Sequence, residues 1–592
     1  NTSGAQAYGD NVTIGAATTL ASTGSGNITV TGTLNGAQTL AVNTAGVTTF
    51  TGAVGGTTPL TSLTTDAAGS TVAANVTTSG TQTYNDPLTT NGTYTTTNSA
   101  FLAAGTTTLA GNTTVTTGTG NATFTGTVNG TTAGTQSLTV NSTGATLFSS
   151  AVGGTTSLAS LTTNTGGTSS LQNVTTSGAQ SYGDNATLNG TYTTTSNGAL
   201  NVAGTTTLAG NTTVSTGSGS VTFTGTVDGT TAGTQALAVN STGATLFSSA
   251  GGVTNRLASV TTNVGGTVSV KDMATTGAQT YGENATLNGT YTTTNGAFTV
   301  GGTTTLAGAV NVATSGGNIT FSDTVNGANA LALIAGTGAV ILGSTVGLTT
   351  PLTGLAIISP SITTRDVKLN NGPFTITGNI TINSTIDTGG GNVAISGTTT
   401  AGSLGNNALV FTTGSGNITL TGAVNGSTNG GQSLTLLSTG ATTLGSSVGG
   451  STALSTFRTD AGGTSSFAGS VSVAGAAGST STQLITIGDT ATATGNVSLN
   501  SANGGAITLN GFTFNSPLTL SISTSGSVII TGTSTVGSIT NPVSFTVTPT
   551  NVQTLNPIGL SFRSPEQPAG LIFAPGSSVS AFLGGSGSSV VL

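Results

Sequence analysis

The chain has no cysteine, no histidine and no tryptophan among its 592 residues. Without cysteine it can form neither disulfides nor thiolate metal sites. Without histidine it lacks the usual imidazole base, imidazole metal ligand and physiological pH switch. We accordingly predict that the chain is not an enzyme, with no catalytic, cofactor-binding or metal-binding residues and no cofactor.

Charge is scarce as well. Lysine and arginine together number 6, aspartate and glutamate 13, so 3% of the residues are charged and the net charge is −7. A nucleic-acid surface needs clustered cations, and six cations spread over this length cannot supply one. We therefore expect no nucleic-acid partner.

Large apolar side chains are also few, because hydrophobic residues make up 34% and aromatic residues 4% of the chain. A conventional globular core needs more. Disordered chains usually combine high charge with few β-branched residues, whereas this chain is rich in Thr, Val and Ile, which favour strands. The 94 glycines oppose helices. The composition therefore predicts ordered β structure built with small side chains.

A segment of the form Gly-Ala-Gln-x-Tyr-Gly-(Asp/Glu)-Asn recurs along the chain. Its tyrosines are separated by 76, 98 and 99 residues: Tyr8, Tyr84, Tyr182 and Tyr281. A second anchor is a strand-like segment ending at Val30, Phe124, Phe223, Phe321 and Leu420. The distance from tyrosine to second anchor is 40, 41 and 40 residues in the later copies but 22 in the first. The first copy therefore lacks about 18 residues, including the Gly-Thr-Tyr-Thr-Thr-Thr stretch that begins at Gly92 in the second.

This deletion favours a repeat architecture in which each coil contacts only its neighbours. Tandem immunoglobulin-like sandwiches have a similar repeat length, but losing such a slice would remove much of a sandwich core. We predict an all-β fold, a parallel β-helix (β-solenoid) rod of roughly 30 coils. The predicted repeats are about 3–78, 79–176, 177–276, 277–375 and 376–490.

Residues 491–592 form a divergent C-terminal β segment, which we interpret as a cap or docking region. Seven of the twelve prolines lie between Pro517 and Pro575. The stretch Ser564–Pro568 cannot be a central strand because proline cannot donate to the ladder. Apolar residues within Gly570–Ala574 indicate a strand there.

Acidic residues follow each anchoring tyrosine by two positions: Asp10, Asp86, Asp184 and Glu283. The last three are whole repeats apart, so they cannot converge on one substrate or cation. Asp228 occupies a position that is Asn in other copies, and Asp66 and Asp460 match Asn164 and Asn263. Interchange of Asp and Asn indicates side-chain hydrogen bonding to the backbone of turns, which we prefer over calcium binding.

The cations mostly neighbour acids, which indicates surface pairing: Lys271 with Asp272, Arg365 and Lys368 with Asp366, Arg458 with Asp460, and Arg563 with Glu566. Arg256 stands alone and has no predicted role.

Tyrosines also occur in pairs, Tyr84/Tyr94, Tyr182/Tyr192 and Tyr281/Tyr291. They fit either stacking platforms for sugars or aromatic pairs packed between successive strands, and we favour packing. Threonine triplets such as Thr106–Thr108 and Thr205–Thr207 suggest an ice-binding surface, but they recur less than once per coil.

The stretch Ala330–Leu348 is apolar enough to imitate a membrane span, but it aligns with Thr/Ser-containing strands at Ser137–Gly154 and Ala236–Gly252. We therefore predict no transmembrane segment. No signal peptide is visible, and we interpret the chain as a mature piece or fragment of a longer protein.

Several runs resemble the haemagglutinin-type β-strand repeats of large secreted bacterial adhesins and surface-fibre proteins. They are Thr205–Gly210, Gly243–Phe247 and Gly317–Phe321 with their counterparts, and the resemblance covers residues 3 to 480. It implies a right-handed parallel β-helix, export across the outer membrane, and adhesion or fibre formation.

From the pattern and this resemblance we expect an extracellular structural and adhesive rod of a bacterial cell surface, contributing to fibres and attachment. The expected partners are further copies, associated end to end or laterally, and glycans or neighbouring cells. The alternatives are an ice-binding β-solenoid and a polysaccharide-active β-helix protein. The latter needs clustered acids and cations, and only Arg365, Asp366 and Lys368 lie together.

Overall fold

The computed structural model describes residues 1–403, 407–475, 483–502 and 505–513, together with the backbone of the strands at 520–524, 528–531, 534–536, 545–549, 560–562 and 571–573. Described residues form strands and no helix, and the strands stack in parallel as a β-solenoid of about 24 coils. This confirms the predicted fold class. The chain divides into two compact units, Asn1–Thr286 with Thr290–Gly296 and Leu287–Gly289 with Ala297–Leu592.

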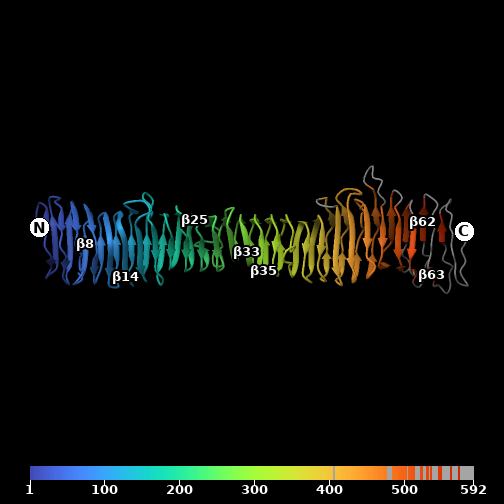
Figure 1. The fold of residues 1–592 in the computed structure, drawn as a ribbon, viewed down its shortest axis with the longest axis horizontal. Helices are drawn as coiled ribbons and strands as arrows, with labels where there is room; N and C mark the ends of the chain where they lie inside the picture. Colours follow the sequence, from blue (N-terminus) through green and yellow to red (C-terminus); the bar gives the residue numbers. More distant parts are fainter. Residues whose placement is uncertain are drawn as a thin grey trace. The chain divides into compact units, whose positions relative to one another are not determined.

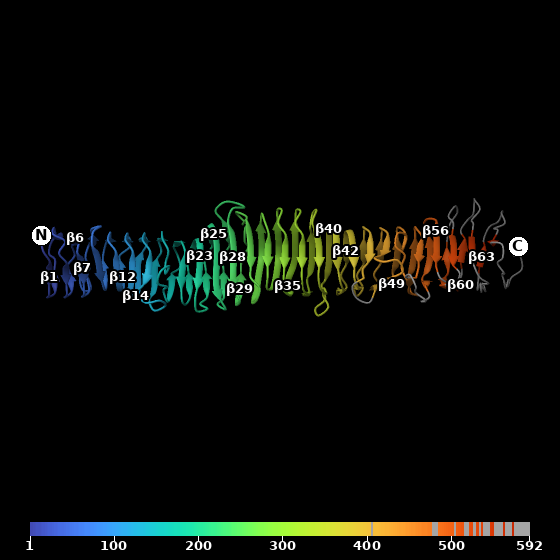
Figure 2. The same cartoon turned by 90° about the horizontal axis from the view of Figure 1, so that it is seen from above.

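Within the first unit, strands of successive coils lie side by side (Figure 1), and loops project at the corners (Figure 2). The third repeat is representative. Its strands are β22 (Gln180–Tyr182), β23 (Asn185–Thr194), β24 (Leu200–Val202), β25 (Thr206–Gly217), β26 (Val221–Phe223), β27 (Val227–Gly229), β28 (Ala236–Ser241), β29 (Ala244–Phe247), β30 (Ser259–Thr262) and β31 (Thr267–Thr275).

Strands alternate between buried and solvent-facing residues, because successive side chains of a strand point to opposite faces. In β28, for instance, Leu237, Val239 and Ser241 are buried, while Ala236, Ala238 and Asn240 face outward. The parallel register stacks equal positions on one another, so that Leu237 lies against Val260 and Val239 against Thr262. The core is therefore a set of side-chain ladders rather than one compact cluster.

Aromatic rings continue these ladders. Phe101 of β13 (Phe101–Ala103), Phe124 of β15 (Ala122–Phe124) and Phe148 of β18 (Ala145–Phe148) are buried. Their centroids are 5.4 and 4.9 Å apart, and the last two rings are stacked at 8°. Phe223 and Phe247 repeat this stack at 5.3 Å. Each contact joins a coil to its neighbour, as nearest-neighbour stabilisation requires.

The short first repeat lacks one whole coil. In the second repeat Tyr84 pairs with Ala103, and Ala103 pairs with Phe124, so two coils separate the anchors. In the first repeat Tyr8 of β1 (Gln6–Tyr8) pairs directly with Val30 of β4 (Ile28–Val30). The deletion predicted from spacing therefore removes one coil and leaves the ladder in register.

The ladder register rules out the sandwich alternative, since the strand pairs of the described residues are parallel and a sandwich is antiparallel. The predicted count of roughly 30 coils was too high, because it assumed coils of 18 to 20 residues. The coil from Leu161 to its partner Gln180 has 19 residues, but that from Val221 to Thr245 has 24. Because corner loops add residues outside the ladder, the average coil is longer than assumed and the chain forms fewer coils.

The second unit repeats this pattern. Its strands include β34 (Phe298–Val300), β35 (Thr304–Thr314), β36 (Ile319–Phe321), β38 (Ala330–Ile334), β39 (Ala339–Leu342), β40 (Gly354–Thr364), β42 (Phe374–Ile382), β47 (Ile418–Leu420), β49 (Ser433–Ser438), β51 (Thr456–Thr459), β54 (Ile485–Ile487), β56 (Val497–Ser501) and β57 (Ile507–Asn510). The apolar stretch Ala330–Leu348 contributes two of these strands, which pair with β40. It is part of the solenoid, as predicted.

Parallel pairing also continues beyond residue 490, where the sequence pattern changes. β54 pairs with β57, and β56 pairs with β59 (Leu520–Thr524). A strand, β64 (Leu571–Phe573), lies within the apolar segment Gly570–Ala574, as predicted. The proline-containing stretch Ser564–Pro568 lies outside the described residues.

Candidate functional site

The repeated motif folds into a buried polar cluster in its second, third and fourth copies. In the third repeat this anchor cluster consists of Gln180, Tyr182, Asp184 and Tyr192, all of them buried. The amide Nε2 of Gln180 donates to Val174 O at 3.3 Å and to Thr193 O at 2.9 Å, and its Oε1 accepts from the Tyr182 hydroxyl at 3.0 Å. Glutamine thus ties its own coil to the next one.

The same bonds recur in the other copies. Gln82 Nε2 donates to Val76 O and Thr95 O, and Gln279 Nε2 to Met273 O and Thr292 O. Tyr84 and Tyr281 donate to these glutamines at 3.3 Å. In the shortened first repeat Gln6 Nε2 donates to Ala21 O at 2.7 Å. Sequence reasoning gave glutamine no role, although it recurs two residues before every anchoring tyrosine.

The tyrosine pairs are packed inside the solenoid, as predicted. The rings of Tyr182 and Tyr192 meet edge to face with centroids 6.3 Å apart, and both are buried. The Tyr192 hydroxyl donates to Leu171 O of the preceding coil at 2.9 Å. Burial raises the pKa of Tyr182 well above its usual value. These rings present no face to solvent on which a sugar could stack.

Of the acids after the tyrosines, Asp86 and Asp184 are buried. Asp86 accepts from the hydroxyls of Thr65 and Thr71 at 2.7 and 2.8 Å. Asp184 accepts from Gly167 N at 2.8 Å and Ser169 Oγ at 2.9 Å. Hydroxyls and backbone N–H groups of the preceding coil compensate the cost of burying each carboxylate.

Asp489 repeats this arrangement in the second unit. It accepts from Gly463 N at 3.1 Å and from the Ser465 hydroxyl. Burial raises the pKa of Asp86 and of Asp489, and in both cases hydroxyl donors oppose the shift. Glu283 is buried without such donors, whereas Asp10 is exposed. The acids lie in separate coils, and no three potential metal ligands come together among the described residues.

A second set of polar side chains links the solenoid corners from outside. The backbone N–H of Thr155 donates to Asn129 Oδ1 at 3.0 Å, and that of Thr254 donates to Asp228 Oδ1 at 2.9 Å. Other copies repeat the bond: Asn35 with Thr57, Asn326 with Thr349, and Asn425 with Ser451. The predicted interchange of Asn and Asp is confirmed here, since both side chains offer the same oxygen acceptor to the backbone N–H.

We expect Asp228→Asn to leave stability unchanged and Asp228→Ala to weaken this corner by about 1 kcal/mol, because the backbone N–H groups of Thr254 and Asn255 lose their acceptor. Hydrogen exchange at residues 254 and 255 measures the difference. Equal exchange in the alanine and asparagine variants would contradict a capping role.

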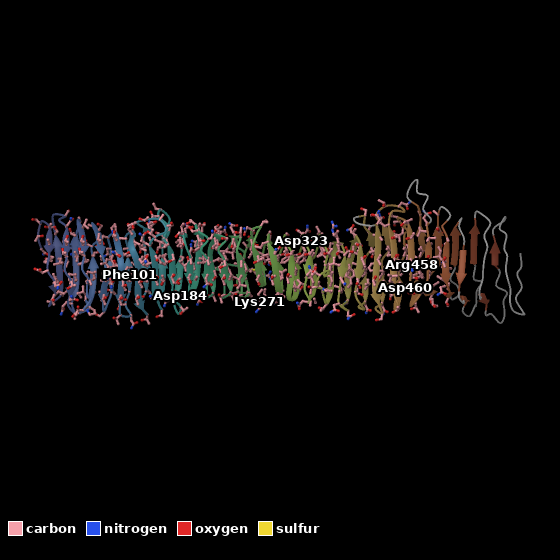
Figure 3. The ribbon with its side chains drawn as sticks, in the orientation of Figure 1. Phe101, Asp184, Lys271, Asp323, Arg458 and Asp460 are labelled. Carbon is pink, nitrogen blue, oxygen red and sulfur yellow. The ribbon has the colours of Figure 1, made fainter. Side chains whose placement is uncertain are left out.

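Two acids that neighbour cations, Asp272 and Asp366, also accept hydrogen bonds from backbone N–H groups. Asp272 Oδ1 accepts from Thr290 N at 2.7 Å, and Asp366 Oδ1 from Thr385 N at 3.0 Å. Lys271 is exposed and lies at the rim of the ribbon in Figure 3. Arg256, which had no predicted role, donates through Nη1 to Thr275 O at 3.5 Å. The structure assigns Asp272 and Asp366 to backbone capping rather than surface ion pairs.

The other two predicted ion pairs are Arg458 with Asp460 and Arg563 with Glu566. Arg458 is exposed, and one carboxylate oxygen of Asp460 is buried without a hydrogen-bond partner. Arg563 and Glu566 lie outside the described residues.

Threonine triplets do not present three hydroxyls to solvent. The middle residue of each triplet points inward: Thr107 and Thr206 are buried, and their hydroxyls lack a hydrogen-bond partner. Only the flanking threonines face outward, as strand alternation requires.

No protein-family model, no curated protein and no solved structure matches the chain. In the part of the chain that the structure describes, no helix has the length and hydropathy needed to cross a bilayer. The inward side chains of the repeated motif hydrogen-bond and pack between coils, and so hold the solenoid together from inside.

Proposed function

We propose that the chain is an extracellular structural and adhesive element of a bacterial cell surface, contributing to fibres and attachment. The observation that carries this proposal is the use of the repeated motif. Gln180, Tyr182, Asp184 and Tyr192 are all buried. Gln180, Asp184 and Tyr192 hydrogen-bond to neighbouring coils, and the Tyr182 ring packs against that of Tyr192. What recurs along the sequence is therefore a means of stacking coils.

The outer surface supports the same proposal. Outward positions carry mainly Thr, Ser, Asn and Ala, and the chain has only 19 charged residues (6 basic and 13 acidic). Like charges in a stacked ladder would repel one another, whereas hydroxyl and amide side chains stack without that cost. A neutral hydroxyl-rich surface presents many weak hydrogen-bonding groups. Such a surface suits attachment to glycans or to further copies of the chain.

Electron microscopy of the purified chain tests the assembly part of this proposal. We expect elongated particles that join end to end or laterally into fibres as concentration rises. Particles that stay dispersed at high concentration would remove fibre formation from the proposal. Adhesion is tested separately, by counting bacterial cells retained on beads coated with the chain and on uncoated beads, and equal retention would contradict it.

A further inference from the structure

Glu283 differs from the other buried acids of the anchor clusters. Asp86, Asp184 and Asp489 each accept two hydrogen bonds from hydroxyl or backbone donors of the preceding coil. Both carboxylate oxygens of Glu283 are buried, and neither has a hydrogen-bond partner. An unpaired buried carboxylate is far more costly than one with donors.

Two substitutions within the repeat explain the difference. The hydroxyl donors Thr71 and Ser169 occupy a position that is Val268 in this copy, as the register shows: Thr48 pairs with Thr71, Thr146 with Ser169 and Thr245 with Val268. The acid itself is glutamate instead of aspartate, which adds one methylene group. The other potential donor, the Thr262 hydroxyl, is also buried without a hydrogen-bond partner.

No cation compensates this carboxyl group. Between residues 229 and 322 the other charged side chains are Arg256, Lys271 and Asp272. Arg256 donates to Thr275 O, Lys271 is exposed, and Asp272 accepts from Thr290 N. The remaining titratable groups on the neighbouring strands are Tyr281 and Tyr291, both buried. Burial raises the pKa of Tyr281, which keeps its hydroxyl neutral.

We propose that Glu283 makes its coil a proton-dependent weak point, which is closed when the carboxyl is protonated and opens more readily when it ionises. The coil comprises β30, β31, β32 (Gln279–Tyr281) and the start of β33 (Asn284–Thr293). A protonated carboxyl carries no charge and can remain buried. An ionised one must find water, which requires the coil to separate from its neighbours.

The direction of the pH dependence follows from linkage. Burial raises the pKa of Glu283 from 4.5 to about 7. The nearby Thr262 hydroxyl lowers this pKa in part, although it does not reach hydrogen-bonding geometry with the carboxyl group. Between these two values the opened coil releases its proton while the closed coil keeps it. The closed form is therefore most stable below pH 4.5, and its advantage is lost as pH rises to about 7.

Hydrogen exchange of the whole chain, corrected for intrinsic rates, tests this proposal at about pH 5 and about pH 8. We expect protection of residues 259–286 to fall at least tenfold between these conditions, since one pKa unit corresponds to a tenfold change. The equivalent residues 160–187, which contain Asp184 and its donors, serve as an internal control. Their protection is expected to stay constant.

Two variants assign the effect. Glu283→Gln removes the titrating group, so the coil should show equal protection at both pH values. Val268→Ser restores the hydroxyl found at Ser169 and should reduce the pH dependence. Equal protection of the wild-type coil at both pH values would overturn the proposal. An unchanged pH dependence in the glutamine variant would overturn it too, because another group would then be responsible.

Discussion

Gln180→Glu is expected to destabilise its coil by about 3 kcal/mol or more at neutral pH. The change preserves the size of the side chain but removes the N–H donors that Val174 O and Thr193 O accept. Each buried carbonyl left without a donor costs about 1–3 kcal/mol. The new carboxylate would also be buried beside those carbonyl oxygens, which repel its negative charge.

This loss should depend on pH. A protonated glutamic acid supplies one O–H donor, so the damage is smaller near pH 5 than near pH 8. Hydrogen exchange of residues 174–202 measures it. Asn240→Asp is the matched control, since it makes the same amide-to-acid change at an exposed position of the same repeat. If both variants retain wild-type protection, the glutamine bonds do not hold the coils together.

The repeat architecture could be predicted because solenoid geometry leaves traces in residue spacing. The interval of 22 residues between Tyr8 and Val30, against about 40 elsewhere, marks the loss of one coil. The Asn/Asp interchange at Asp228 likewise predicted backbone capping. In both cases the pattern depends on contacts between adjacent coils, which repeat with the sequence.

The interior polar cluster was harder to predict. Gln180 and Tyr182 are two residues apart in a strand, and this spacing places them on one face. The spacing alone could have indicated an inward pair. The inward direction of Asp184 had no such signal, because Gly183-Asp184 follows a strand and looks like an ordinary turn. Only the fold shows that this corner directs the carboxyl toward Ser169 of the preceding coil.

Coil count and coil length were also beyond the sequence pattern. Loop residues such as Thr131–Gly134 enlarge a corner without adding a rung to the ladder, so residue number does not convert directly into coils. Function was harder still to predict from the sequence, because neutral side chains that hold coils together form no clustered reactive groups that a motif could reveal.

In the strand ladders each coil pairs only with the coils directly before and after it, so a whole coil can be removed in register. Deleting Ala186–Thr205 performs this operation in the third repeat. Thr206 is the register partner of Ala186, so it would take that place after Asn185. Tyr182 pairs with Val202, and Val202 with Phe223. The deletion would therefore pair Tyr182 with Phe223 directly.

The first repeat already shows that the glutamine bonds survive such a change, since Tyr8 donates to Gln6 Oε1 at 2.9 Å. Gln180 would lose its acceptor Thr193 O, but Ser215, the register partner of Thr193, would take its place. Gln6 makes the corresponding bond to Ala21 O in the short repeat. A matched control deletes only Ala186–Thr195, about half a coil, which brings mismatched side chains inward.

Hydrogen exchange of β22 and β26 in these two deletion variants shows whether the strand ladder re-forms across the deletion. We predict that removal of the whole coil leaves protection within about tenfold of the wild type, whereas removal of half a coil abolishes it. Loss of protection in both variants would show the opposite, namely that the coils depend on more than their immediate neighbours.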